Sequence, residues 1–146
     1  MRKIFVDTNI LPDVVMHRSD FHVQSAMVWA GCENRKVRGF VSAVSLNHMR
    51  YVMRKRVEPS VALEYVRLVL NVFSVVPPDE AILRLAVDLP HRDFEDAIQT
   101  FSAVQAKVDC IVTRDRRHFP GSCMPVVSPA EYSDLFGSGQ SPGLTR

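Results

Sequence analysis

Three aspartates stand where their carboxylates could act together, although they are far apart in the sequence. Asp7 ends the apolar run KIFV, Asp115 follows CIVTR, and Asp96 lies between them in DFEDAIQ. If the two runs are neighbouring strands of a parallel sheet, Asp7 and Asp115 lie at its carboxyl edge, where ligands bind in α/β proteins. A turn or a helix cap is the simpler interpretation of each aspartate alone.

The stretch DFEDAIQ is expected to begin a helix that runs from Phe94 to Lys107. At about 100° per residue, one face of this helix is apolar; it consists of Phe94, Ala97, Ile98, Phe101, Val104 and Val108. Asp96 borders that face, whereas Glu95, Gln99 and Ser102 fall on the side away from it. We therefore expect Asp96 to face the site and Glu95 to face water.

Three converging carboxylates require a positive charge between them, because each pair at about 4 Å repels by roughly 4 kcal/mol at an effective dielectric of about 20. Oxygen ligands suit Mg²⁺ or Mn²⁺ rather than zinc. Such an ion orients a water, makes it more acidic and neutralises charge on a phosphoryl group. The predicted chemistry is phosphodiester hydrolysis, with Asp7, Asp96 and Asp115 as catalytic and metal-binding residues.

The elements that must position these residues alternate along the chain. Short runs rich in Val, Ile or Phe predict strands at Ile4–Val6, Val37–Val41, Val72–Val76, Cys110–Val112 and Pro125–Val127. Helical periodicity and cap residues predict helices at Phe21–Asn34, Ala43–Arg56, Val61–Asn71, Asp79–Leu89 and Phe94–Lys107. Strands separated by helices indicate an α/β fold with a mainly parallel sheet covered on both faces.

The composition is that of one globular domain: 146 residues, of which 47% are hydrophobic and 23% charged. Three cysteines without a CxxC pair suggest neither a disulfide framework nor a zinc site, and they favour a reducing compartment. No apolar run approaches the ~20 residues of a membrane helix, so we expect a cytoplasmic protein. The segment Gly137–Arg146 is expected to be a flexible tail, and its glycines do not form a dinucleotide-binding GxGxxG.

Four stretches, FVDTNIL, VSAVSLNHMRYVMRK, DFEDAIQ and IVTRDRRHF, together resemble a PIN domain, most closely the branch related to VapC-type toxins of toxin-antitoxin systems. No single stretch is specific, but the ordered set spans Arg2 to about Phe136, so residues 1–136 would form the domain. The resemblance implies a three-layer α/β/α fold with a five-stranded sheet and a Mg²⁺- or Mn²⁺-dependent ribonuclease. It also implies a homodimer and, often, a small antitoxin partner.

Position by position, the resemblance assigns the acids of the family to Asp7, Asp96 and Asp115. It assigns the supporting polar positions to Asn9, Ser42 and Thr113.

One position departs from the family, which commonly has a glutamate about six residues beyond the serine; here that position is His48. A packed core histidine beside Val44 and Val52 is the favoured interpretation, over a ligand for a softer metal. Asp93, one helical turn from Asp96, is a further candidate metal ligand. The missing glutamate keeps an alternative open, in which a PIN-like module with an impaired site binds RNA or a protein.

Four basic residues surround Asp115 in the sequence: Arg114, Arg116, Arg117 and His118. We expect the three arginines to bind the RNA backbone. A second basic cluster ends the helix after Ser42, where cations also complement the helix dipole; it consists of Arg50, Arg54, Lys55 and Arg56. The net charge of +2 alone does not indicate a nucleic-acid partner.

Overall fold

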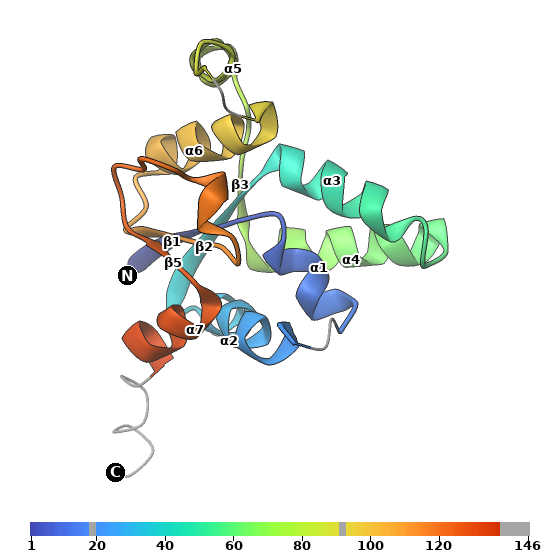
Figure 1. Ribbon diagram of the computed structural model, residues 1–146. Coiled ribbons are helices and arrows are strands. Elements are labelled where there is room, and N and C mark those ends of the chain that lie inside the picture. The colour runs from blue at the N-terminus through green and yellow to red at the C-terminus, as the bar shows by residue number, and fades with distance from the viewer. Residues whose placement is uncertain (18–19, 91–92, 138–146) are drawn as a thin grey trace.

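Five parallel strands form one sheet in the order β3-β2-β1-β4-β5 (Figure 1). The computed structural model describes residues 1–17, 20–90 and 93–137. The strands are β1 (Arg2–Val6), β2 (Val37–Ser42), β3 (Ser74–Val76), β4 (Cys110–Val112) and β5 (Val126–Val127). The predicted α/β fold is confirmed, and the sheet is parallel throughout the described residues.

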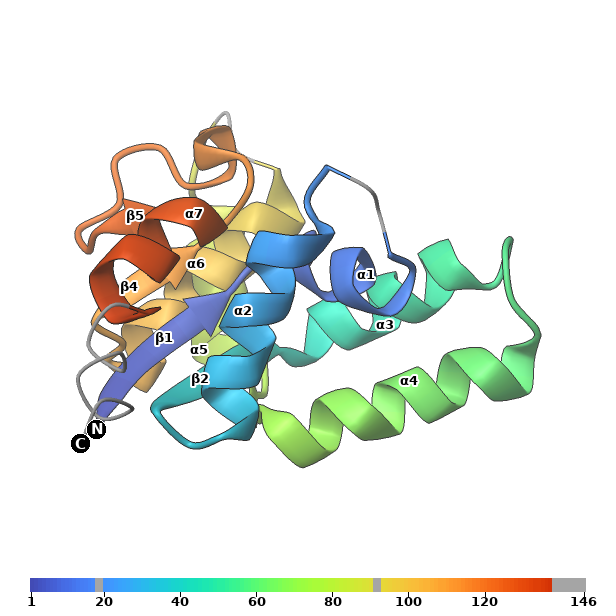
Figure 2. The same ribbon diagram turned by 90° about the horizontal axis from the view of Figure 1, so that it is seen from below.

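Helices cover both faces of the sheet. They are α1 (Ile10–Val15), α2 (His22–Glu33), α3 (Ala43–Met53), α4 (Pro59–Val72), α5 (Glu80–Val87), α6 (Phe94–Ala106) and α7 (Pro129–Tyr132). Figure 1 shows α6 and α5 above the sheet and α2 and α7 below it, and Figure 2 shows α3 and α4 side by side as an extension of the molecule. A short 3₁₀ helix, η1 (Arg116–His118), follows β4, and a π-helical turn, η2 (Ser133–Gly137), follows α7.

Alternation along β1 divides the interior into two cores. Ile4 and Val6 belong to a core shared with α1, α2, α3, α4 and α7. Phe5 points the other way, into a core shared with α5 and α6. Because all three side chains are fully buried, β1 is a central strand with both faces covered.

The register of the central strands places the end of β1 beside the end of β4. Val6 pairs with Val112, and the backbone N–H of Asp7 donates to the carbonyl of Val112 at 3.0 Å. The residues that follow the two strands, Asp7 and Thr113, therefore lie next to each other. The adjacency of β1 and β4 that the site requires is thus present.

Helix α1 was not predicted from the sequence. It has only six residues and includes Pro12, and its N-cap residue, Asn9, makes no capping hydrogen bond with its side chain. The usual helix signals are therefore weak. The expected tail, residues 137–146, lies outside the described residues except for Gly137, which ends η2. Among the described residues, no helix combines the length and apolar character needed to span a membrane.

Candidate active site

Asp7 is the buried centre of the site. Its side chain is 1% exposed, and its Oδ2 accepts hydrogen bonds from Thr113 Oγ1 at 2.6 Å and from His118 Nδ1 at 2.9 Å. The Thr113 hydroxyl also accepts the backbone N–H of Asp115 at 3.0 Å. The threonine after β4 thus fixes the carboxylate after β1, as expected for a supporting residue.

His118 brings a positive charge to the predicted acids. Its Nε2 lies 3.8 Å from Asp115 Oδ2, while its Nδ1 contacts Asp7. The hydrogen bond to Asp7, with the negative charges of Asp7, Asp96 and Asp115, raises the pKa of His118 to about 9 against the effect of its partial burial. A protonated imidazole therefore lies among the acids at neutral pH. The sequence offered His118 only as one of several basic residues.

Asp115 is held by Arg117. It caps η1 by accepting the backbone N–H of Arg117 at 3.0 Å, and the guanidinium binds both carboxylate oxygens at 2.9 and 2.8 Å. These hydrogen bonds hold the pKa of the Asp115 carboxyl well below its usual range. Asp115 thus lies beside His118 and performs the capping role that is common for aspartate, but it does not line the cleft that opens at the end of β1.

A cleft of about 520 Å³ opens at the carboxyl end of β1. The residues that line it are Asp7, Thr8, Asn9, Pro12, His48, Val52, Asp93, Glu95, Asp96 and His118. Two of the three predicted acids, Asp7 and Asp96, share this cleft with the further candidate Asp93. The cleft therefore brings together residues that are up to 111 positions apart in the sequence.

Asp96 is an acid of this cleft whose ionised form is disfavoured by its surroundings. Burial is the largest cause that raises the pKa of Asp96 to about 6; the charges of Asp93, Asp7 and Glu95 contribute to the rise, and His118 opposes it. Asp93 caps α6, because its Oδ1 accepts the backbone N–H of Asp96 at 3.1 Å. A bound cation would relieve the repulsion among these carboxylates.

The predicted phase of helix α6 was wrong. Gln99, placed on the outer side, is 1% exposed and accepts the backbone N–H of Thr8 at 3.2 Å; Ser102 is also buried. Phe94 and Val104, placed on the apolar face, are 48% and 43% exposed. Gln99 turns inward because Thr8 and Ser45 donate hydrogen bonds to its side chain, whereas the hydroxyl of Ser102 donates to the carbonyl of Ile98 in the same helix.

Glu95 consequently lines the cleft and does not face bulk water as predicted. Its Oε1 lies 2.7 Å from His48 Nδ1, and its Oε2 accepts from Thr8 Oγ1 at 3.4 Å. Thr8 is in turn bonded to Ser45 Oγ at 2.7 Å. The glutamate is therefore held between α3 and the chain after β1.

The prediction of His48 as a packed core residue was also wrong. Its side chain is 45% exposed and lines the cleft opposite the start of α6. Of its two predicted helical neighbours, Val52 also lines the cleft. A histidine that reaches across to Glu95 has a role at the site that its position on a helical wheel did not indicate.

Each of the three arginines predicted to bind RNA has an acidic partner within the protein. Arg114 Nε lies 2.6 Å from Oδ2 of the fully buried Asp13, as an ion pair and not an aligned hydrogen bond, and its guanidinium stacks on Phe21 at 4.1 Å. Arg116 pairs with Glu131. Arg117 pairs with Asp115, but its side chain is 90% exposed. Arg114 therefore anchors α1, whereas Arg117 remains accessible to a polyanion.

The other two supporting residues have local structural roles. Ser42 is buried and caps α3, accepting the backbone N–H of Val44 at 3.2 Å. Asn9 lines the cleft, and its Oδ1 accepts the backbone N–H of Arg114 at 3.5 Å. Asn9 thus ties the segment after β1 to the segment after β4, whereas Ser42 fixes the start of α3, the helix that carries His48.

The donors in the cleft suit a hard divalent cation. Among the described residues, no three His, Cys, Asp or Glu side chains lie close enough to enclose an ion by themselves. Mg²⁺, however, typically keeps several waters and uses one or two carboxylates. Asp7 and Asp96, one buried and one partly desolvated, fit that kind of ligation.

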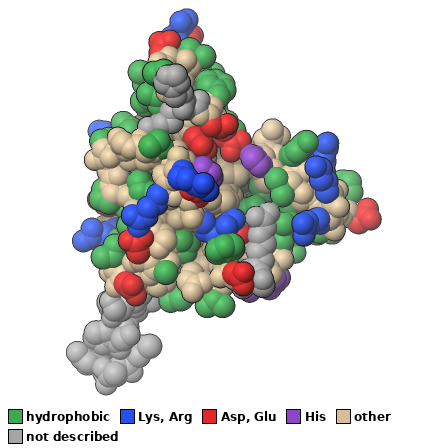
Figure 3. Space-filling model, viewed as in Figure 1, with side chains coloured by type: hydrophobic (Ala, Val, Ile, Leu, Met, Phe, Trp, Pro, Cys, Tyr) green, Lys and Arg blue, Asp and Glu red, His purple; other side chains and the backbone are tan. Residues whose placement is uncertain are grey.

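The surface over the cleft is divided by charge. Figure 3 shows acidic side chains gathered between the start of α6 and the start of α3, with histidines beside them and Lys or Arg side chains directly below. Negative charge for a cation and positive charge for a phosphate thus lie next to each other on one face.

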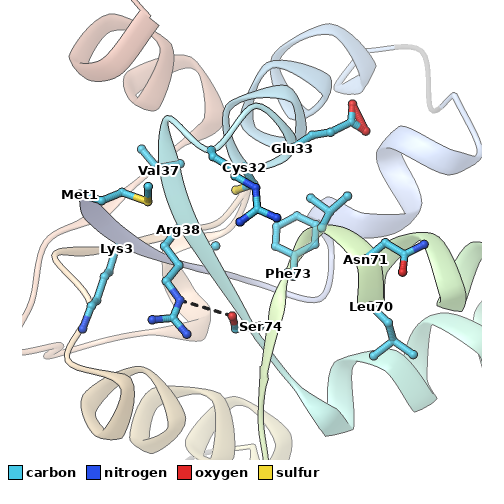
Figure 4. Close-up of a pocket in the computed structure, with 13 residues that line it drawn as sticks. Met1, Lys3, Cys32, Glu33, Val37, Arg38, Leu70, Asn71, Phe73 and Ser74 are labelled. Atoms are coloured by element: carbon cyan, nitrogen blue, oxygen red, sulfur yellow. Dashed lines mark hydrogen bonds between the residues drawn. The ribbon is translucent and has the colours of Figure 1, made fainter.

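A larger cavity, of about 660 Å³, lies at the opposite edge of the sheet, where β1, β2 and β3 begin (Figure 4). Its polar side chains include Lys3, Arg35 and Arg38, and Arg38 Nε donates to Ser74 Oγ at 3.4 Å. Helices α2 and α4 end there, so these cations complement two helix dipoles. The cavity contains none of the predicted acids, and we therefore place the candidate active site at the smaller cleft.

Comparison with known proteins bears on the fold and not on the position of the site. A family model described as PIN domain matches residues 3–117. No curated protein gives a match. The similar solved structures include VapBC2 from Rickettsia felis bound to a promoter DNA fragment, at 12% identity and a TM-score of 0.65 over 86% of this chain and 98% of that chain.

Two further structures are similar. VapC20 from Mycobacterium tuberculosis, described as a Sarcin-Ricin loop cleaving toxin, has 18% identity and a TM-score of 0.63 over 79% of this chain and 92% of that chain. FitAcB from Neisseria gonorrhoeae has 18% identity and a TM-score of 0.66 over 87% and 98%. At these identities the likeness shows a shared fold.

Proposed function

This chain belongs to the PIN domain family, and from that premise we propose that it is a Mg²⁺- or Mn²⁺-dependent endoribonuclease that hydrolyses RNA phosphodiester bonds. The observation that carries the proposal is the meeting of Asp7 and Asp96 in one cleft beside His118. The ion would be held by Asp7 and Asp96, with Asp93 or Asp115 as additional ligands. When bound, it would acidify a water and neutralise charge on the phosphoryl group.

The protein's own residues then have separate tasks. Thr113 orients the Asp7 carboxylate through its 2.6 Å hydrogen bond. Arg117, exposed beside Asp115, contacts the RNA backbone. His118 keeps a positive charge next to the acids, which lowers their repulsion when no ion is bound.

We also propose that the protein is the toxin of a toxin-antitoxin pair, with a small antitoxin partner. The similar structures include VapBC and FitAB assemblies, and this likeness supports such a partner.

The proposal is tested by incubating the purified protein with RNA in the presence of Mg²⁺, Mn²⁺ or EDTA. We expect cleavage with a divalent ion, none with EDTA, and a loss of about 10²-fold or more in Asp7→Asn and Asp96→Asn, as for removal of a group that stabilises transition-state charge. Asp88→Asn, an exposed acid at the end of α5, is the matched control and should keep wild-type activity.

Tight binding of RNA without cleavage under either ion would contradict the proposal. That result would favour the alternative of a PIN-like module with an impaired site.

A further inference from the structure

We propose that His48, oriented by Glu95, is a catalytic residue of this cleft that donates a proton to the leaving ribose oxygen. The inference rests on the proposed ribonuclease function and adds to it a group outside the set of aspartates. It is drawn from the contact between helices α3 and α6, which bring the two side chains together from positions 47 apart in the sequence.

The pair is built like other pairs in which a carboxylate orients a histidine. Glu95 Oε1 lies 2.7 Å from His48 Nδ1, so the ring donates its Nδ1 proton to the carboxylate. The second ring nitrogen, Nε2, is then the atom available to a substrate. In the protonated ring, Nε2–H carries the proton that a substrate can receive.

Glu95 is itself held in place. Its other oxygen accepts from Thr8 Oγ1 at 3.4 Å, and Thr8 is bonded to the buried Ser45 at 2.7 Å. Glu95 is 27% exposed and His48 is 45% exposed, so the glutamate is the inner and the histidine the outer member. A fixed carboxylate behind an accessible imidazole is the arrangement expected when the imidazole meets the substrate.

The position of His48 in the cleft suits the leaving group more than the metal. His48 comes from α3, whereas the carboxylates of Asp7 and Asp96 come from β1 and α6. Imidazole is also a poor ligand for Mg²⁺, which prefers oxygen ligands. His48 lines the cleft with its imidazole partly exposed, so it can meet a substrate bound there.

The step balances without any further reactant. Water forms a new P–O bond and releases one proton to solvent, while the P–O bond to the leaving ribose oxygen breaks. His48 Nε2–H gives its proton to that oxygen, which leaves as a hydroxyl group, and the neutral ring regains a proton from solvent for the next turnover. Proton transfer by a positioned side chain contributes about 10²- to 10⁴-fold to a rate.

The test uses a leaving group that does not need a proton. After the cleavage position in an RNA oligonucleotide has been mapped, the leaving oxygen is replaced by sulfur, because a thiolate departs without protonation. We expect His48→Gln to lower kcat on the oxygen substrate by about 10²- to 10⁴-fold and to cleave the sulfur substrate at close to the wild-type rate. Glu95→Gln should show the same pattern with a smaller loss.

Asn47→Ala is the matched control, since Asn47 is exposed on the same helix and does not line the cleft. Because His48 is partly exposed, His48→Gln should melt at the wild-type temperature, so a folding defect would not imitate the result. Equal losses on both substrates, or a rise in KM with kcat unchanged, would overturn the assignment and make His48 a binding residue.

A second measurement needs no turnover. Long-range ¹H–¹⁵N spectra of the histidine rings should show Nδ1 of His48 protonated in the wild type and a changed Nδ1 signal in Glu95→Gln. If the wild type cleaves RNA and His48→Gln cleaves it equally fast, this inference alone is contradicted. Absence of cleavage by the wild type with either ion would sink the proposed function and the proton-transfer role together, while the spectra would still report whether the orienting pair exists.

Discussion

At the scale of single residues, Glu95 and Asp96 show how neighbours in sequence take different roles. Asp96 is a desolvated acid near the Asp7 carboxylate, and Glu95 is the hydrogen-bond partner of His48. The sequence predicted Asp96 correctly as a cleft residue but placed Glu95 in water. The error arose because an apolar-face argument cannot foresee that Gln99 is buried by a backbone hydrogen bond.

The residues that bridge distant elements were the least predictable. Asp7 follows a recognisable strand, and its meeting with Thr113 depends only on two neighbouring strands. The contacts of His118 and His48 depend instead on where η1 and α3 lie against other elements. No local pattern encodes that placement.

Replacing Asp96 by asparagine should stabilise the metal-free protein. Its raised pKa, about 6, means that the charged form is disfavoured in the folded state, so ionised Asp96 lowers stability above that pH. At pH 7.5 in EDTA, Asp96→Asn should therefore melt at a higher temperature than the wild type. Differential scanning calorimetry measures the difference.

With Mg²⁺ or Mn²⁺ bound, the wild type should instead melt at a higher temperature than Asp96→Asn. With an assumed Kd of about 1 mM and about 10 mM Mg²⁺, binding to the folded state adds ~1.4 kcal/mol, or roughly 3 to 6 °C in Tm. The shift should be smaller in Asp96→Asn. A wild-type Tm that neither Mg²⁺ nor Mn²⁺ changes, together with a less stable mutant in EDTA, would mean that Asp96 acts only as a helix-end acid.

At the scale of elements, the strands were predictable because each contains a short apolar run rich in Val, Ile or Phe. The five predicted strands all occur, with bounds that differ by a residue or two. Helices α1 and α7 and the turn η2 were missed, since short helical turns depend on tertiary contacts more than on propensity.

Strand β2 contains a glycine that packing requires. A Cβ added at Gly39 would lie 2.6 Å from a ring carbon of Phe73 and 2.5 Å from Cys32 Sγ. Gly39→Ala should therefore lower the free energy of unfolding by about 1 to 3 kcal/mol through overpacking. Urea denaturation measures this loss, with the adjacent and exposed Arg38→Gln as the control; equal stability of the two variants would contradict it.

At the scale of the whole molecule, α4 exposes apolar side chains, of which Leu63 and Leu70, seven residues apart on one side of the helix, are a candidate surface for the expected homodimer. Val61, Leu63, Leu68 and Leu70 are 39% to 51% exposed on this helix. Light scattering should give a mass of about twice 16.5 kDa, and Leu63→Lys should shift it towards the monomer because a buried lysine would be unpaired. Leu85→Lys on α5 is the control; a monomeric wild type would contradict the dimer.

The central place of β1 in the sheet also governs when the protein can become active during synthesis. The first strand to leave the ribosome lies between β2 and β4, and β4 begins only at Cys110. Thr113 and His118, whose side chains fix Asp7, emerge later still. Contacts over such sequence separations form slowly, so the nascent chain carries Asp7 without these partners until His118 has been made. The proposed activity would therefore be withheld from the cell until synthesis has passed β4 and η1.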